Sequence, residues 1–183
     1  IAEMERQIPH EIMHILEYQI IGPYYNQAPV WLLEGLASTA ELYPNPEYQQ
    51  VIQNAVDNDG LIPLSLLCEE FPRDLSGVIL AYAESRSFVN YLHQNYGSSG
   101  IVTLLNHYKD GQNCKAGIEA AFGIPLSELE TRWQKDALGH NVRLTAWKKL
   151  LPYFLVALFI LVPFGLSFIP MRHKPKDIKA VRR

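Results

Sequence analysis

The sequence predicts a mainly α-helical domain followed by a single membrane-spanning helix. Apolar residues recur at helical spacing along much of the first 138 residues, and no segment shows a convincing period-two strand pattern. A 20-residue run without a charged side chain then follows, at residues 150–169. The length of 183 residues leaves room for one globular domain and an appendage.

The first two helices are predicted from apolar periodicity and from the residues that end them. Isoleucines recur at helical spacing over residues 8–21, and Gly22-Pro23 is a strong helix breaker. A loop rich in tyrosine and proline follows. Residues 31–42 form the second predicted helix, which the proline-containing stretch from Pro44 ends.

Five further helices are predicted, each bounded by turn-forming residues. They cover residues 47–57, 75–96, 99–109, 114–122 and 127–138. Gly97 should end the long helix over 75–96, because glycine is the common residue after a helix C-terminus. Ser127 followed by Glu130 has the spacing of a capping box at the start of the last helix.

The C-terminal apolar run, residues 150–169, is predicted to cross a membrane. At 1.5 Å per residue it spans about 30 Å, the thickness of a hydrocarbon core. Trp147 and Tyr153 lie where an interfacial aromatic belt is expected, and basic residues flank the run. A buried core helix is the alternative, and the complete lack of charge argues against it.

The charge distribution separates the domain from the tail. Residues 1–149 contain 10 Lys/Arg and 18 Asp/Glu, which gives no basic surface for nucleic acid. Residues 170–183 contain 6 Lys/Arg and one Asp, so the tail is expected in the cytoplasm and the domain outside it. The alternative of a tail-anchored protein with a cytoplasmic domain remains open, because basic residues also precede the predicted span.

The expected organisation has four parts. Residues 1–139 form the globular domain, 140–149 a juxtamembrane linker, 150–169 the transmembrane helix and 170–183 the basic tail. The chain opens with Ile1 inside a helical pattern, so we expect it to be the C-terminal fragment of a longer protein.

The two cysteines, Cys68 and Cys114, fit no zinc-binding spacing. Two small buried thiols are the expected state. A disulfide is the alternative, and it would require an oxidising compartment.

The sequence His10-Glu11-Ile12-Met13-His14 has the HExxH pattern. Positions i and i+4 of a helix lie one turn apart on the same face, so both imidazoles can reach one metal ion. Glu11 lies beside them and can take a proton from a metal-bound water. A hydrolytic zinc site needs a third protein ligand and an open position.

The second predicted helix supplies that ligand, because the break at Gly22-Pro23 allows the helix to fold back and present Glu34 to the metal. The segment from Trp31 to Ala37, with the pattern WxxEGxA, resembles the gluzincin clan of metallopeptidases, and in particular the peptidase MA-like and aminopeptidase N-like families. The resemblance implies the helical zinc-binding half of a zincin-type domain. In such a site His10, His14 and Glu34 hold one Zn²⁺ and Glu11 is the catalytic base.

The resemblance extends over about residues 5–138 and implies a role for Tyr82. In the aminopeptidase branch a tyrosine at the matching position stabilises the oxyanion, which suits a neutral phenol donor. The alternative is that Tyr82 only packs a helix face.

The sequence departs from the family one turn after Glu34, where Ser38 replaces the usual carboxylate. Glu41, on the same helix face, is the expected substitute that orients a ligand histidine. The alternative is that Glu41 lies on a solvent-exposed face of the helix and orients no histidine.

Together these features predict a membrane-anchored zinc metallopeptidase that hydrolyses peptide bonds in a peptide or protein substrate with a zinc-bound water. An inactive zinc-holding module that binds peptides or a partner protein at the membrane is one alternative, and the presence of Glu11 argues against it. A helical scaffold with a coincidental HExxH is another, and Glu34 argues against that.

Overall fold

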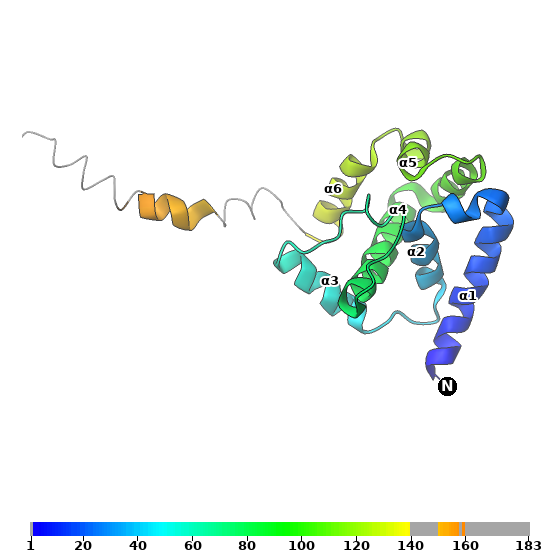
Figure 1. Cartoon of the computed structure of the whole chain (residues 1–183), viewed down its shortest axis with the longest axis horizontal. Helices are drawn as coiled ribbons and strands as arrows, with labels where there is room; N and C mark the ends of the chain where they lie inside the picture. Colours follow the sequence, from blue (N-terminus) through cyan, green and yellow to red (C-terminus); the bar gives the residue numbers. More distant parts are fainter. Residues whose placement is uncertain (1, 140–149, 158, 160–183) are drawn as a thin grey trace, which may run out of the picture. The chain divides into compact units, whose positions relative to one another are not determined.

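The computed structural model describes residues 2–139, 150–157 and 159, and in these residues all regular structure is helical, as predicted. The described residues 2–139 belong to one compact unit. Its elements are α1 (Ala2–Ile21), the 3₁₀ helix η1 (Gly22–Gln27), α2 (Val30–Ala40), α3 (Glu47–Asp57), α4 (Leu75–Lys109), α5 (Cys114–Phe122) and α6 (Leu126–Asp136) (Figure 1).

The long helix α4 lies at the centre of this unit, and α1, α2, α3, α5 and α6 all contact it. Phe88 of α4 packs edge-on between two buried tryptophans, with ring centroids 4.9 Å from Trp31 and 5.5 Å from Trp133. Helix α2 approaches α4 closely at Gly35, where an added Cβ would lie 2.6 Å from the carbonyl oxygen of Ser85. Glycine beside Glu34 therefore lets α2 pack directly on the α4 backbone.

Helix α1 turns its polar side towards the rest of the unit. Three isoleucines from which the helix was predicted are exposed: Ile8 by 52%, Ile12 by 50% and Ile15 by 57%. Arg6, His10 and Glu17 are instead buried. The helix begins at Ala2, before the predicted start at residue 8, and it contains Pro9. The buried side of α1 is thus the side that bears the site residues.

The predicted helix boundaries hold in the middle of the chain and fail at one cap. Gly97 adopts φ 68° inside α4 and joins two helical segments, which matches the predicted end near residue 96. The capping box predicted from Ser127 and Glu130 is wrong, because Pro125 is the N-cap residue of α6 and makes no side-chain bond. Glu130 accepts a hydrogen bond from the backbone N–H of Leu64 instead, at 2.9 Å.

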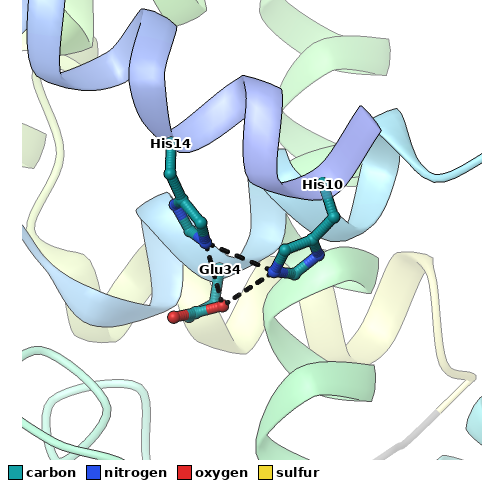
Figure 2. A group of neighbouring side chains, drawn as sticks. All are labelled: His10, His14 and Glu34. Carbon is teal, nitrogen blue, oxygen red and sulfur yellow. Dashed lines mark hydrogen bonds and ion pairs between the residues drawn. The ribbon is translucent and has the colours of Figure 1, made fainter. Parts of the chain in front are cut away.

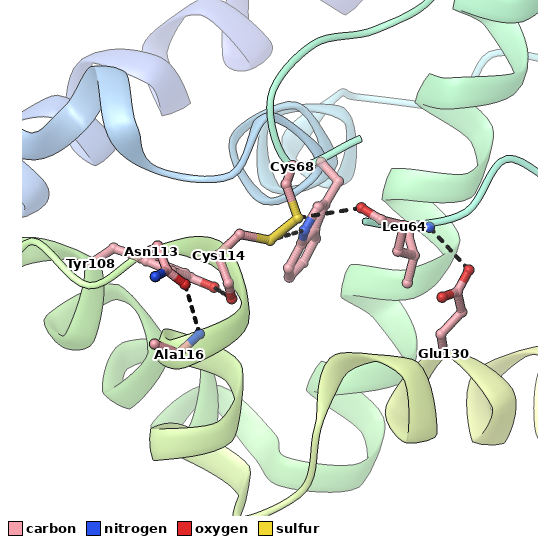
Figure 3. Close-up of a disulfide and its surroundings, with 8 residues drawn as sticks. Leu64, Cys68, Tyr108, Asn113, Cys114, Ala116 and Glu130 are labelled. Atoms are coloured by element: carbon pink, nitrogen blue, oxygen red, sulfur yellow. Dashed lines mark hydrogen bonds between the residues drawn. A yellow bond between two sulfur atoms is a disulfide. The ribbon is translucent and has the colours of Figure 1, made fainter. Parts of the chain in front are cut away.

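Cys68 and Cys114 form a disulfide, so the expectation of two free thiols is wrong (Figure 3). The indole N–H of Trp31 donates to Cys114 Sγ at 3.4 Å. The carbonyls of Leu67 and Cys68 accept the N–H groups of Trp31 and Val30, at 3.0 and 3.1 Å. The two cysteines meet because the segment that pairs with the start of α2 also lies against the start of α5.

Closing a loop with a sequence separation of 46 residues is worth about 4 kcal/mol in the chain-entropy description of disulfides. The cross-link therefore fixes the segment that satisfies the first backbone donors of α2, the helix that bears Glu34.

The predicted membrane span lies mostly outside the described residues. Residues 150–157 and 159 are helical. Within the described ranges, no helix combines the length and the apolar character needed to cross a membrane. The predicted linker at 140–149 and the basic tail at 170–183 lie outside the described residues, and the span stays a prediction.

Candidate metal centre

Helices α1 and α2 bring His10, His14 and Glu34 to one point (Figure 2). The Nε2 atoms of the two histidines are 3.2 Å apart. Glu34 Oε2 lies 3.4 Å from Nε2 of His10 and 3.6 Å from Nε2 of His14. The Glu34 side chain is only 22% exposed, so it faces the histidines and not the solvent.

The spacing of these three atoms fits one zinc ion. Ligand atoms about 2.0–2.1 Å from a tetrahedral zinc are about 3.3 Å from one another. The observed separations of 3.2, 3.4 and 3.6 Å agree with that triangle. Two imidazoles and one carboxylate are also a common ligand set of catalytic zinc, and they leave a fourth position open.

The other nitrogen of each imidazole faces a buried carboxylate. Nδ1 of His10 lies 3.4 Å from Oε1 of Glu41, and the Glu41 carboxylate also pairs with Arg6. Nδ1 of His14 lies 3.0 Å from Oε2 of Glu17. Such carboxylates fix the orientation of a ligand imidazole and raise its basicity. The Glu41 side chain is 1% exposed, so it does not lie on a solvated face.

Sequence reasoning missed Glu17, whose side chain is 1% exposed. It follows His14 by three positions on α1, which is one helical turn, so the spacing could have revealed it. Tyr25 was also missed. Its hydroxyl lies 3.3 Å from Nδ1 of His14 and is brought there by η1, a contact that spacing along the chain cannot indicate.

The ionisable side chains of the site shift one another's pKa values. Burial disfavours the ionised form of Glu34, but hydrogen bonds with His10 and His14 outweigh burial and lower the pKa of Glu34 to about 2. Hydrogen bonds to Glu17 and Glu34, opposed by burial, raise the pKa of His14 to about 10. In the metal-free protein His14 is therefore protonated at neutral pH, and a metal ion must displace that proton.

Tyr82 lies beside the three converging side chains. Its ring centroid is 6.3 Å from that of His10, and Phe71 packs edge-on against its other side at 5.1 Å. Burial, the charge of Glu34 and a hydrogen bond to Glu34 raise the pKa of Tyr82, so the phenol stays neutral. A neutral phenol of this kind can donate a hydrogen bond.

Glu11 is exposed on α1, next to the converging residues. With His10, Glu41 and Tyr82 it lines a cleft of about 270 Å³, which we call the catalytic cleft. A small molecule or a peptide segment can reach Glu11 there, whereas Glu17 is buried and does not line the cleft.

The helices and this donor set define a helical domain whose three converging side chains could hold a metal ion beside an accessible cleft. The chain belongs to the peptidase MA superfamily, whose family model matches residues 1–139. A search of curated proteins and a search of solved structures gave no match. The family match supports a peptidase domain, while the aminopeptidase N-like likeness stays a prediction from the sequence.

Proposed function

We propose that this protein is a zinc-dependent metallopeptidase of the gluzincin type. The observation that carries the proposal is the triangle of His10 Nε2, His14 Nε2 and Glu34 Oε2, with Glu11 exposed in the adjoining cleft. Membership of the peptidase MA superfamily supports the same reaction class.

Each side chain has a defined task in this proposal. His10, His14 and Glu34 would hold the ion, with Glu41 and Glu17 orienting the two imidazoles. When bound, zinc supplies Lewis-acid chemistry and makes water a stronger acid. Glu11 accepts the proton of the attacking water and delivers it to the leaving amine nitrogen. Tyr82 donates a hydrogen bond to the oxygen on which negative charge develops.

Hydrolysis of a peptide pool tests the proposal directly. The protein purified with zinc should cleave peptides, a chelator should stop cleavage, and added zinc should restore it. Mass spectrometry of the products identifies the cleaved bonds. Zinc bound at one ion per chain without any cleavage would favour the alternative of an inactive peptide- or partner-binding module.

Tyr82→Phe should lower kcat by about 100-fold or more, because it removes a single donor to the developing oxyanion. Zinc affinity should stay unchanged, since the phenol is not a ligand. Steady-state kinetics and a zinc titration measure the two effects. Tyr96→Phe is the matched control, because Tyr96 lies on α4 outside the lining of the catalytic cleft and packs against Phe122. Full activity in Tyr82→Phe would leave Tyr82 with a packing role only.

We also propose that residues 150–169 anchor the domain in a membrane, with the domain outside the cytoplasm and the tail inside. The uncharged run and the basic tail support the anchor and its orientation. The Cys68–Cys114 disulfide supports a location of the domain outside the cytoplasm, because disulfides persist in oxidising compartments.

Protease added to intact cells should remove the domain and leave the tail protected. An epitope tag at each end of the chain reports the result. A domain that is digested only after lysis would place it in the cytoplasm, as in the tail-anchored alternative. That outcome would leave the zinc chemistry unaffected.

A further inference from the structure

A second, larger cavity adjoins the catalytic cleft. Its volume is about 580 Å³, and it lies between α3 and α4, with the end of α6 contributing to its wall. Asn45 and Tyr48 line both this cavity and the catalytic cleft. We call the larger cavity the α3–α4 groove. The two spaces are therefore neighbours that share a wall.

Helix α4 connects the catalytic cleft to the α3–α4 groove along its length. Tyr82 lines the catalytic cleft, and Arg86, Asn90 and Gln94, on successive turns of the same helix, line the groove. From Tyr82 to Gln94 the helix rises by about 18 Å. An extended peptide, at about 3.3 Å per residue, covers that distance with about five residues.

The lining of the groove suits a peptide backbone better than an isolated ion. Four carboxamides face it, from Asn45, Gln49, Asn90 and Gln94. Each carboxamide has donors and an acceptor, as does each peptide unit. Its two charged side chains, Arg86 and Asp136, have opposite signs, so the lining carries no net charge.

From this arrangement we infer that the α3–α4 groove binds about five residues of extended polypeptide on one side of the scissile bond. The inference rests on the proposed function for the reaction itself. It adds the substrate class, which is an unfolded polypeptide segment and not a dipeptide.

A series of peptides with one cleavable bond tests the inference. Each peptide is lengthened by one to six residues on one side of the bond or on the other. On one side, kcat/KM should rise by about tenfold or more up to about five residues and then level off, because each backbone hydrogen bond contributes modestly. Equal kcat/KM for all lengths on both sides would overturn the inference.

Substitutions at two adjacent positions test whether the dependence of kcat/KM on peptide length arises in the α3–α4 groove. Gln49 and Gln50 are both exposed on α3, but only Gln49 lines the groove. Gln49→Trp should fill the groove and reduce the ratio of long-peptide to short-peptide kcat/KM by about tenfold. Gln50→Trp should leave that ratio unchanged. Equal ratios in the two variants would place the length dependence outside the groove and overturn the inference.

A binding measurement separates this inference from the proposed function. A fluorescent ten-residue peptide is titrated with the zinc-loaded Glu11→Gln protein, and its anisotropy is followed. Binding that Gln49→Trp weakens and Gln50→Trp preserves would support the groove even if no peptide is ever cleaved. Absence of saturable binding, or equal binding by both tryptophan variants, would overturn the groove even if zinc-dependent cleavage is found.

Discussion

Zinc binding is expected to be lost when any one of His10, His14 and Glu34 is replaced by alanine. The intact protein should bind one zinc ion per chain, because the three ligand atoms form one tetrahedral face. Structural zinc sites bind with about 10 kcal/mol or more, so losing one of three ligands should cost about 3 kcal/mol. That corresponds to at least about 100-fold weaker binding. Competition with a chromogenic chelator measures the affinity, and elemental analysis measures the content.

His93→Ala is the matched control for the two histidine substitutions. His93 is exposed on α4 and hydrogen-bonds to Ser98, away from the converging side chains. Its replacement should leave zinc content and affinity unchanged. Circular dichroism should show the same helix content in all variants. One zinc ion per chain retained in a His10→Ala/His14→Ala double variant would exclude the proposed centre.

Glu11→Gln should retain zinc and lose peptide hydrolysis. The amide keeps the shape of the side chain but cannot accept the proton of the attacking water, and general base catalysis contributes about 10²–10⁴-fold. The expected fall in kcat lies in that range. Because Glu11 is exposed in the cleft and none of the three converging atoms belongs to it, zinc affinity should stay within error of the unchanged protein.

Glu5→Gln provides the comparison for Glu11→Gln. Glu5 is also exposed on α1 and does not line the catalytic cleft. The control removes the same charge from the same helix, so any general electrostatic effect on the substrate appears in both variants. Full turnover by Glu11→Gln would assign the base to another residue. Loss of zinc from Glu11→Gln would instead show that Glu11 supports the metal.

The elements that sequence reasoning located well are those with local physical causes. The spacing of His10 and His14 on one helix turn decides that the two imidazoles share a face. Gly97 allows the left-handed backbone that interrupts α4, so the predicted end near residue 96 is found as a kink. The pattern around Glu34 indicated the second helix and the carboxylate that the structure brings to the histidines.

Sequence periodicity was misleading for the orientation of α1. Ile8, Ile12 and Ile15 suggest the usual apolar inner face, yet they are exposed, while Arg6, His10 and Glu17 are buried. Burying these charged and polar groups is favourable only because each has a partner: Glu41 pairs with Arg6 and His10, and His14 hydrogen-bonds to Glu17. Partners on α2 are not visible in the periodicity of α1.

The predictions for Glu130 and for the two cysteines were wrong for a similar reason. Local spacing suggested that Glu130 belongs to a capping box. Its carboxylate instead accepts a hydrogen bond from the N–H of Leu64, 66 residues away. Cys68 and Cys114 have no informative spacing, and their pairing depends on how the segment before α4 packs against α5.

The sequence by itself determined the helical class, the pair of histidines on one turn, the candidate base Glu11 and the third candidate ligand Glu34. The helical class, the histidine pair and Glu11 depend on helix geometry and on the chemistry of the side chains, which act over a few residues. Glu34 was indicated instead by the resemblance of its segment to the gluzincin clan. Only the tertiary structure decided how Glu34, Glu41 and Tyr82 lie around the histidines. Their positions follow from the close approach of α2 to α4 and from the disulfide-held segment that caps α2, contacts between residues far apart in the chain.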